Sequence, residues 1–133
     1  MAQRVVIVGA GQAGAQVAIS LRQLGLAGTI VVLGDEPHAP YQRPPLSKAL
    51  LTGEVEVERI AIRSGAYYEK HGIELRPGVR VARIERDAGA VVIEDGQSLA
   101  YESLVLCTGT RARRLGLPGE SLPGVFYLRT LDD

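Results

Sequence analysis

The apolar residues near the start of the chain occur first in an unbroken run and then at helical spacing. Arg4–Val8 is a short β-branched segment followed by glycine, which is typical of a strand buried on both faces. From Gln12 to Leu24 apolar residues recur at helical spacing, and Gly25 supplies a stop. A second apolar run covers 29–33. These patterns predict a strand–helix–strand unit with parallel strands and a right-handed crossover.

A proline-rich loop over 34–45 interrupts the regular pattern. The two prolines that end this loop, together with Gly53, frame a predicted short helix. Ser64–His71 is predicted as another helix, capped by its first serine and followed by a glycine. A third short strand is expected at Ile73–Leu75.

From Val79 to Tyr101 the period changes to alternation, which predicts antiparallel strands with tight turns. The expected strands are Val79–Val81, Ala90–Glu94 and Leu99–Tyr101. Leu104–Cys107 is predicted as another buried strand, and Val125–Leu128 as a last short strand. The expected fold class is α/β, with a Rossmann-like parallel sheet that carries an antiparallel β-meander.

The composition narrows the possible functions. With 133 residues the chain has room for one domain, and 46% hydrophobic residues are normal for a globular protein. The 15 Lys and Arg balance the 15 Asp and Glu, so global charge does not favour nucleic acid or an anionic membrane as a partner. No apolar run is long enough to span a membrane, and a strand-like run begins too early for a signal peptide. A cytoplasmic protein is therefore expected.

The segment Gly9-Ala10-Gly11-Gln12-Ala13-Gly14 fits the pattern G-x-G-x-x-G between a predicted strand and a predicted helix. Gly9 permits a tight turn, Gly11 lets the backbone approach a pyrophosphate, and Gly14 allows close helix–strand packing. The amides at the helix N-terminus, assisted by the helix dipole, then face the anion. The motif predicts a site for the ADP half of a dinucleotide, and the alternative is a glycine-rich turn without a ligand.

The end of the second predicted strand supplies an acid for the adenosine ribose. Asp35 follows Gly14 by 21 residues, near the spacing of about 20 expected for a carboxylate that accepts hydrogen bonds from the ribose hydroxyls. Such a carboxylate repels a 2′-phosphate, which disfavours NADP in this site. The alternative is that Asp35 and Glu36 are ordinary loop acids. FAD and NAD share the ADP half, so the glycine motif and Asp35 do not distinguish a site for FAD from a site for NAD.

Two further segments favour FAD. Residues 34–48, with the string Tyr-Gln-Arg-Pro-Pro-Leu-Ser-Lys at their end, closely resemble the FAD-dependent ferredoxin reductases of the putidaredoxin reductase and rubredoxin reductase type. Residues 127–131 resemble a later motif of the same group. The meander before a strand ending in Thr108-Gly109 resembles the FAD domain of glutathione-reductase-like flavoproteins, which have two dinucleotide-binding domains. The resemblance extends from Val5 to Asp132, and it implies a glutathione-reductase-type FAD-binding domain that is incomplete here.

The resemblance also implies individual contacts with FAD. Ala13 would lie against the pyrophosphate and Asp35 would hold the ribose, with Glu36 as a weaker candidate. The other implied contacts are Arg43 and Lys48 on the flavin side, Val81 at the adenine, Thr108 and Gly109 near the pyrophosphate, and Arg129 from the last strand. Lys48, beside the flavin, is also the candidate catalytic residue. The alternatives are that Lys48 is a solvated helix residue, Arg43 covers the prolines, and Val81 belongs to the core.

The activity implied by the resemblance is electron transfer from NADH or NADPH through FAD to a [2Fe–2S] ferredoxin. Members of the group are about three times longer than this chain, as expected for several domains. Residues 1–133 are therefore expected to be the N-terminal part of the FAD-binding domain, without the NAD-binding and C-terminal domains. This part alone is expected to be inactive and open to self-association through an exposed sheet edge. The alternatives are a nucleotide-binding module without turnover, an NADH oxidase and a flavin monooxygenase.

The cysteine content sets this chain apart from the disulfide reductases of the same superfamily. Their redox pair needs two nearby cysteines, and Cys107 is the only one here. We interpret it as a small hydrophobic residue of a buried strand. His38 and His71 lack ligand-like spacing, so no metal site is expected. Three basic residues, Arg111, Arg113 and Arg114, form either a patch for an acidic ferredoxin or part of a solvated loop.

Overall fold

Consecutive apolar residues place β1 (Arg4–Val8) and β2 (Thr29–Leu33) at the centre of a parallel sheet. The computed structural model describes residues 3–133, and its main sheet has the order β3-β2-β1-β7. β1 pairs with β2 along its whole length, and β3 (Ile73–Arg76) and β7 (Ser103–Leu106) extend the sheet in parallel. The predicted Rossmann-like parallel sheet is confirmed.

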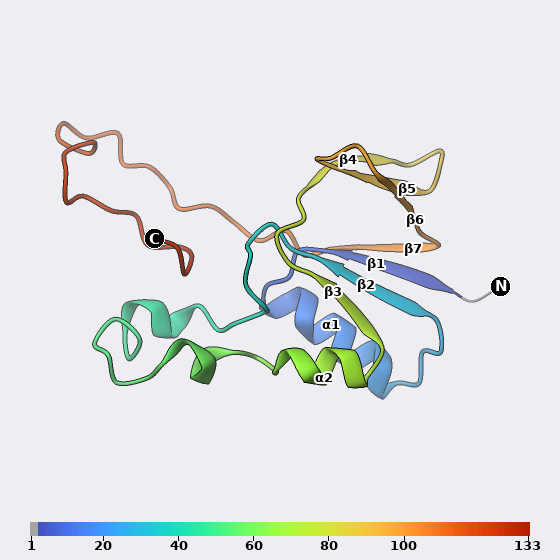
Figure 1. Cartoon of the computed structure of the whole chain (residues 1–133). Helices are drawn as coiled ribbons and strands as arrows, with labels where there is room; N and C mark the ends of the chain where they lie inside the picture. Colours follow the sequence, from blue (N-terminus) through green and yellow to red (C-terminus); the bar gives the residue numbers. More distant parts are fainter. Residues whose placement is uncertain (1–2) are drawn as a thin grey trace.

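Helices cover one face of this sheet (Figure 1). α1 (Gln12–Gln23) and α2 (Gly65–Lys70) pack there, and Ile7 and Tyr68 belong to the buried cluster beneath them. Ser64 occupies the N-cap position of α2, as predicted, but its side chain makes no capping hydrogen bond. Within residues 3–133, neither helix is long and apolar enough to cross a membrane.

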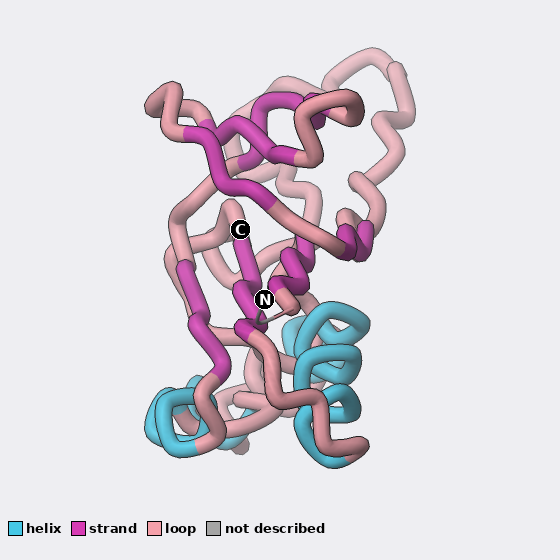
Figure 2. Tube along the Cα trace, turned by 90° about the vertical axis from the view of Figure 1, so that its right-hand side faces the viewer, coloured by secondary structure: helices cyan, strands magenta, loops and turns pink. Residues whose placement is uncertain are grey.

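The β-meander covers the opposite face, so the molecule has three layers (Figure 2). Its strands β4 (Val81–Glu85), β5 (Ala90–Ile93) and β6 (Ser98–Ala100) form an antiparallel sheet in the order β4-β5-β6. Val6 of β1 and Val91 of β5 belong to the second buried cluster, between the two sheets. Because both of their faces are buried, β1 and β2 are apolar without alternation.

The segment after β2, for which one short helix was predicted, contains two 3₁₀-helices. η1 (Pro44–Ser47) begins at the predicted pair of prolines, and η2 (Val57–Ile60) has no counterpart among the predicted elements. The backbone of Lys48 (φ −132°, ψ −116°) is not helical, which ends η1 after one turn. Tyr41 and residues of both 3₁₀-helices form a small third cluster.

Two sequence predictions about the C-terminal third are wrong. The strand at Ser103–Leu106 is only partly buried, and Leu106 is 57% exposed, because β7 lies at the edge of the sheet. Val125–Leu128 is not a strand, since no neighbouring strand pairs with it. Residues 108–133 instead form an arm that runs away from both sheets and returns toward the proline-rich loop (Figure 1).

Candidate functional site

The three glycines between β1 and α1 differ in what surrounds them. Gly9 has φ +111°, and a Cβ there would come closer than 3.0 Å to the carbonyl oxygen of Cys107. A Cβ on Gly14 would overlap the carbonyl oxygen of Gly9 in the same way. At Gly11, by contrast, a Cβ would meet nothing within 4 Å. Gly9 and Gly14 therefore allow the turn to close, while Gly11 leaves the backbone open toward the space in front of it.

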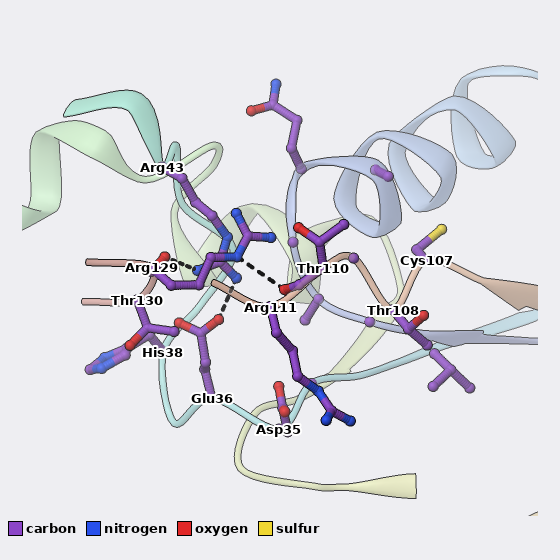
Figure 3. A pocket seen from close by; sticks show the side chains of 18 of the residues that line it. Asp35, Glu36, His38, Arg43, Cys107, Thr108, Thr110, Arg111, Arg129 and Thr130 are labelled. Atoms are coloured by element: carbon purple, nitrogen blue, oxygen red, sulfur yellow. Dashed lines mark hydrogen bonds and ion pairs between the residues drawn. The ribbon is translucent and has the colours of Figure 1, made fainter. Parts of the chain in front are cut away.

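That space is a pocket of about 1080 Å³ at the carboxyl ends of β1, β2 and β7. Ligands of open α/β sheets bind at this end of the strands. The lining comes from the turn at 8–13, the loop at 33–36, residues 79–81, residues 106–112 and the end of the arm, together with His38, Tyr41, Arg43 and Pro44. Figure 3 shows side chains from these segments around the pocket. The size and the crowded glycine turn fit an extended dinucleotide.

The two acids that follow β2 have different surroundings. Asp35 is exposed, lines the pocket, and has no hydrogen bond or ion pair to any residue between 3 and 133. Glu36 accepts hydrogen bonds from the Tyr41 hydroxyl and from the Arg43 guanidinium. Figure 3 shows the contact between Glu36 and Arg43. Of the two carboxylates, Asp35 is the one available to a ligand.

Gly34 also lines the pocket and is not among the site residues predicted from the sequence. A Cβ there would lie 2.5 Å from the Cβ of Ala10, so the loop after β2 packs directly on the glycine turn. Gly34 also receives a hydrogen bond from the Val79 amide at 2.7 Å. This bond brings the start of the meander, including Val81, to the pocket. A glycine directly after the second strand was the available signal.

The opposite side of the pocket is formed by the turn after β7. The Cys107 amide donates to the Val8 carbonyl at 2.7 Å, and Thr108 and Gly109 follow at the lining. Arg129 reaches this turn from the arm, and its Nε donates to the Thr110 carbonyl at 3.1 Å. Arg129 therefore lines the pocket, although it lies in an irregular segment of the arm instead of a strand.

Two of the predicted site residues lie outside the lining. Gly14 packs behind the turn, as its helix–strand role implies. Lys48 is exposed, and its Nζ lies 3.4 Å from the Pro44 carbonyl. The structure brings the other predicted residues together at the pocket: Gly9, Gly11, Ala13, Asp35, Glu36, Arg43, Val81, Thr108, Gly109 and Arg129.

Basic side chains at the pocket mouth were not assigned to it from the sequence. Arg80 and Arg111 both contribute to the lining. Arg114 is elsewhere, with its guanidinium 4.4 Å from the ring centre of Tyr127. Arg111 and Arg114 therefore lie in different surroundings. Within residues 3–133, no group of three His, Cys, Asp or Glu side chains is arranged to hold a metal ion.

The family model for pyridine nucleotide-disulphide oxidoreductases matches residues 3–133. The chain belongs to this family. Among curated relatives, rhodocoxin reductase of Rhodococcus erythropolis is 51% identical over 126 residues, which is 95% of this chain and 30% of that protein. A ferredoxin–NAD(P)(+) reductase of Sphingomonas is 49% identical over 97% of this chain and 31% of its own length.

Two solved structures each match 98% of this chain. Putidaredoxin reductase, in its covalent complex with putidaredoxin, has a TM-score of 0.90 and 42% identity over 98% of this chain. The ferredoxin reductase for the CYP199A2 system from Rhodopseudomonas palustris has a TM-score of 0.91 and 45% identity. The chain spans 32% of each of these proteins. The family uses FAD with NAD(P)H as substrate, in agreement with the cofactors expected from the resemblance.

Proposed function

We propose that this chain binds FAD as part of a reductase that transfers electrons from NADH or NADPH to a [2Fe–2S] ferredoxin. The observation that carries the proposal is the crowded glycine turn at Gly9, which opens onto a pocket with the unpaired carboxylate of Asp35. The reaction class comes from the relatives, which are ferredoxin and rhodocoxin reductases by name. The proposal includes a cytoplasmic location, the compartment that supplies NADH and NADPH.

Each part of FAD has a partner in this proposal. The amides of Gly11, Gln12 and Ala13 at the N-terminus of α1 hold the pyrophosphate, because they are unpaired within the helix and the dipole favours an anion. Asp35 accepts hydrogen bonds from the adenosine ribose, and Val81 lies beside the adenine. The flavin, when bound, accepts a hydride and releases electrons singly.

The turn after β7 and the loop before η1 supply the remaining contacts in this proposal. Thr108 and Gly109 line the pyrophosphate region, and Arg129 reaches the cofactor from the arm. Lys48 stays a candidate for contact with the flavin, since its exposed side chain has one weak contact at 3.4 Å and is free to reorient. A lysine there would favour the anionic reduced flavin by charge attraction.

The competing functions are a nucleotide-binding module without turnover, an NADH oxidase and a flavin monooxygenase. The first is separated from the proposal by the visible spectrum of a protein of the relatives' full length, equilibrated with FAD and then freed of unbound cofactor. Retained flavin bands support the proposal, whereas a colourless protein that binds NADH supports a plain nucleotide module. Reduction of a [2Fe–2S] ferredoxin, measured on a protein of the relatives' full length, separates a reductase from the oxidase and the monooxygenase.

Substitution of Asp35 by alanine is expected to weaken FAD binding about 10- to 100-fold, or roughly 1.5–3 kcal/mol, because charged hydrogen bonds to the ribose are lost. The measurement is a titration followed by quenching of flavin fluorescence. Asp87→Ala in the β4–β5 turn is the matched control, since it removes the same charge from an exposed position outside the pocket. Equal effects of the two substitutions would show that Asp35 does not bind the ribose.

Replacement of Cys107 by alanine is expected to leave FAD content and flavin reduction near normal. Burial raises the pKa of the Cys107 thiol, so it is protonated at neutral pH and a poor nucleophile. The chain holds no second cysteine to form a redox pair with it. The flavin-to-protein ratio, and the rate at which NADH reduces the flavin in a protein of the relatives' full length, are compared between variant and parent. Loss of flavin reduction in a folded, FAD-loaded variant would contradict a scheme without a disulfide.

A further inference from the structure

The side chains of Glu36, Tyr41 and Arg43, which follow β2, form a hydrogen-bonding network. The Tyr41 hydroxyl donates to Glu36 and accepts from the Nη1 of Arg43 at 3.0 Å. The Nη2 of Arg43 donates to the other carboxylate oxygen of Glu36. The side chains of Glu36 and Arg43 are only 19% and 28% exposed, and Tyr41 is 7% exposed. Both carboxylate oxygens of Glu36 therefore accept hydrogen bonds from other residues of the protein.

This network also holds the far end of the chain. The Nη1 of Arg43 donates to the Arg129 carbonyl at 2.8 Å, and the Leu131 amide donates to the Tyr41 hydroxyl at 3.0 Å. Leu131 packs against the cluster that contains Tyr41. These bonds join groups that are 86 and 90 residues apart in sequence. Together with the contact between His38 Nε2 and the Asp132 carboxylate at 2.8 Å, they bring the end of the arm back to the pocket.

The segment held in this way presents the Arg129 guanidinium to the pocket. Its Nη2 would lie 3.4 Å from a Cβ on Gly109, and its Nε donates to the Thr110 carbonyl at 3.1 Å (Figure 3). The Asp133 carboxylate accepts from the backbone amides of Arg129 and Thr130, both at 2.7 Å. The backbone of Arg129 is therefore fixed from both sides, while its side chain spans the turn after β7.

We propose that Glu36, Tyr41 and Arg43 are positioning residues that hold Arg129 where it contacts a phosphate of the dinucleotide, and that Glu36 is not a ribose ligand. This inference rests on the proposed FAD site. Glu36 neutralises Arg43, so Arg129 supplies the cationic contact on this side. Burial, followed by the hydrogen bond to Glu36, raises the pKa of Tyr41 to about 12, so its hydroxyl remains a donor at neutral pH.

The test is the FAD affinity of Tyr41→Phe, which removes the hydroxyl at the centre of the network and leaves the ring. We expect binding to weaken about 10-fold, a change of about 1.4 kcal/mol. Tyr68→Phe is the matched control, because Tyr68 is also buried and its hydroxyl has no partner within residues 3–133. It should leave FAD affinity unchanged. Glu36→Gln, which keeps the shape and an acceptor, should weaken binding less than Glu36→Ala.

A double-mutant cycle with Arg129→Gln separates positioning from general stabilisation. If Tyr41 acts through Arg129, then Tyr41→Phe should have no further effect on FAD affinity once Arg129 has been replaced. Additive losses would overturn the inference, as would a Tyr41→Phe variant that binds FAD like the parent. Failure of the parent chain to bind FAD would refute the proposed function itself. Hydrogen exchange of the Leu131 amide tests the network in the absence of ligand, and it should be faster in Tyr41→Phe than in the parent.

Discussion

Substitution of Gly14 by alanine is expected to destabilise the native structure strongly. The added Cβ would overlap the Gly9 carbonyl oxygen and lie 3.4 Å from Ile7 of the sheet. Neither the backbone carbonyl nor the buried strand has room to move, since Gly9 is itself held against Leu33 by a hydrogen bond of 2.8 Å. Overpacking destabilises by about 1–3 kcal/mol and occasionally more, and an overlap with a fixed backbone carbonyl belongs at the upper end of that range. This is a large part of the roughly 5–15 kcal/mol that stabilise a domain.

The control is Gly11→Ala, which lies only three residues from Gly14 in the chain but has a different predicted effect. Its Cβ meets nothing within 4 Å, and its φ of −84° suits any residue. This variant should fold normally and bind FAD more weakly, because the methyl group occupies the path of the pyrophosphate. Circular dichroism and urea unfolding measure the stability of Gly14→Ala, and a titration with FAD measures the affinity of Gly11→Ala. A stable Gly14→Ala protein would show that α1 can move off the sheet.

The strand–helix–strand unit could be predicted almost residue by residue because its signals are local. Arg4–Val8 and Thr29–Leu33 are strands as predicted, and α1 ends one residue before the predicted Leu24. The last strand prediction failed for a non-local reason. Val125–Leu128 has the composition of a strand, but a strand needs a partner, and a sequence pattern does not report whether one is adjacent.

The site was predictable where it depends on glycine and unpredictable where it depends on long side chains. The crowding at Gly9 follows from a motif with a known geometry. The pairing of Glu36 with Tyr41 and Arg43 joins residues of one loop whose path is set by 3₁₀-turns, so the sequence left Asp35 and Glu36 as joint candidates. Arg22, which donates to four backbone carbonyls near the ends of α1 and α2, likewise has no sequence signature.

The 133-residue chain alone is expected to bind FAD weakly and to show no NADH-dependent reduction of ferredoxin or ferricyanide above that of free flavin. The glycine turn at Gly9 faces a single pocket, at the carboxyl ends of β1, β2 and β7, whereas hydride transfer from NADH to FAD needs two dinucleotides held together. The pocket wall formed by residues 108–112 is largely exposed, so it encloses the flavin end poorly. Most of the binding energy should therefore come from the adenosine end.

The same chain is expected to self-associate through β7 and the arm. β7 is an edge strand with unpaired backbone groups on its outer side, and most of the exposed large hydrophobic residues lie at or beyond its end: Leu106, Leu115, Leu117, Leu122, Val125, Phe126 and Leu128. Phe126, at 78% exposure, is the best position for a test. Sedimentation of the parent should give a mass above that of a monomer, and Phe126→Ser together with Leu122→Ser should lower it. A monomeric parent that binds FAD tightly and oxidises NADH rapidly would contradict both expectations.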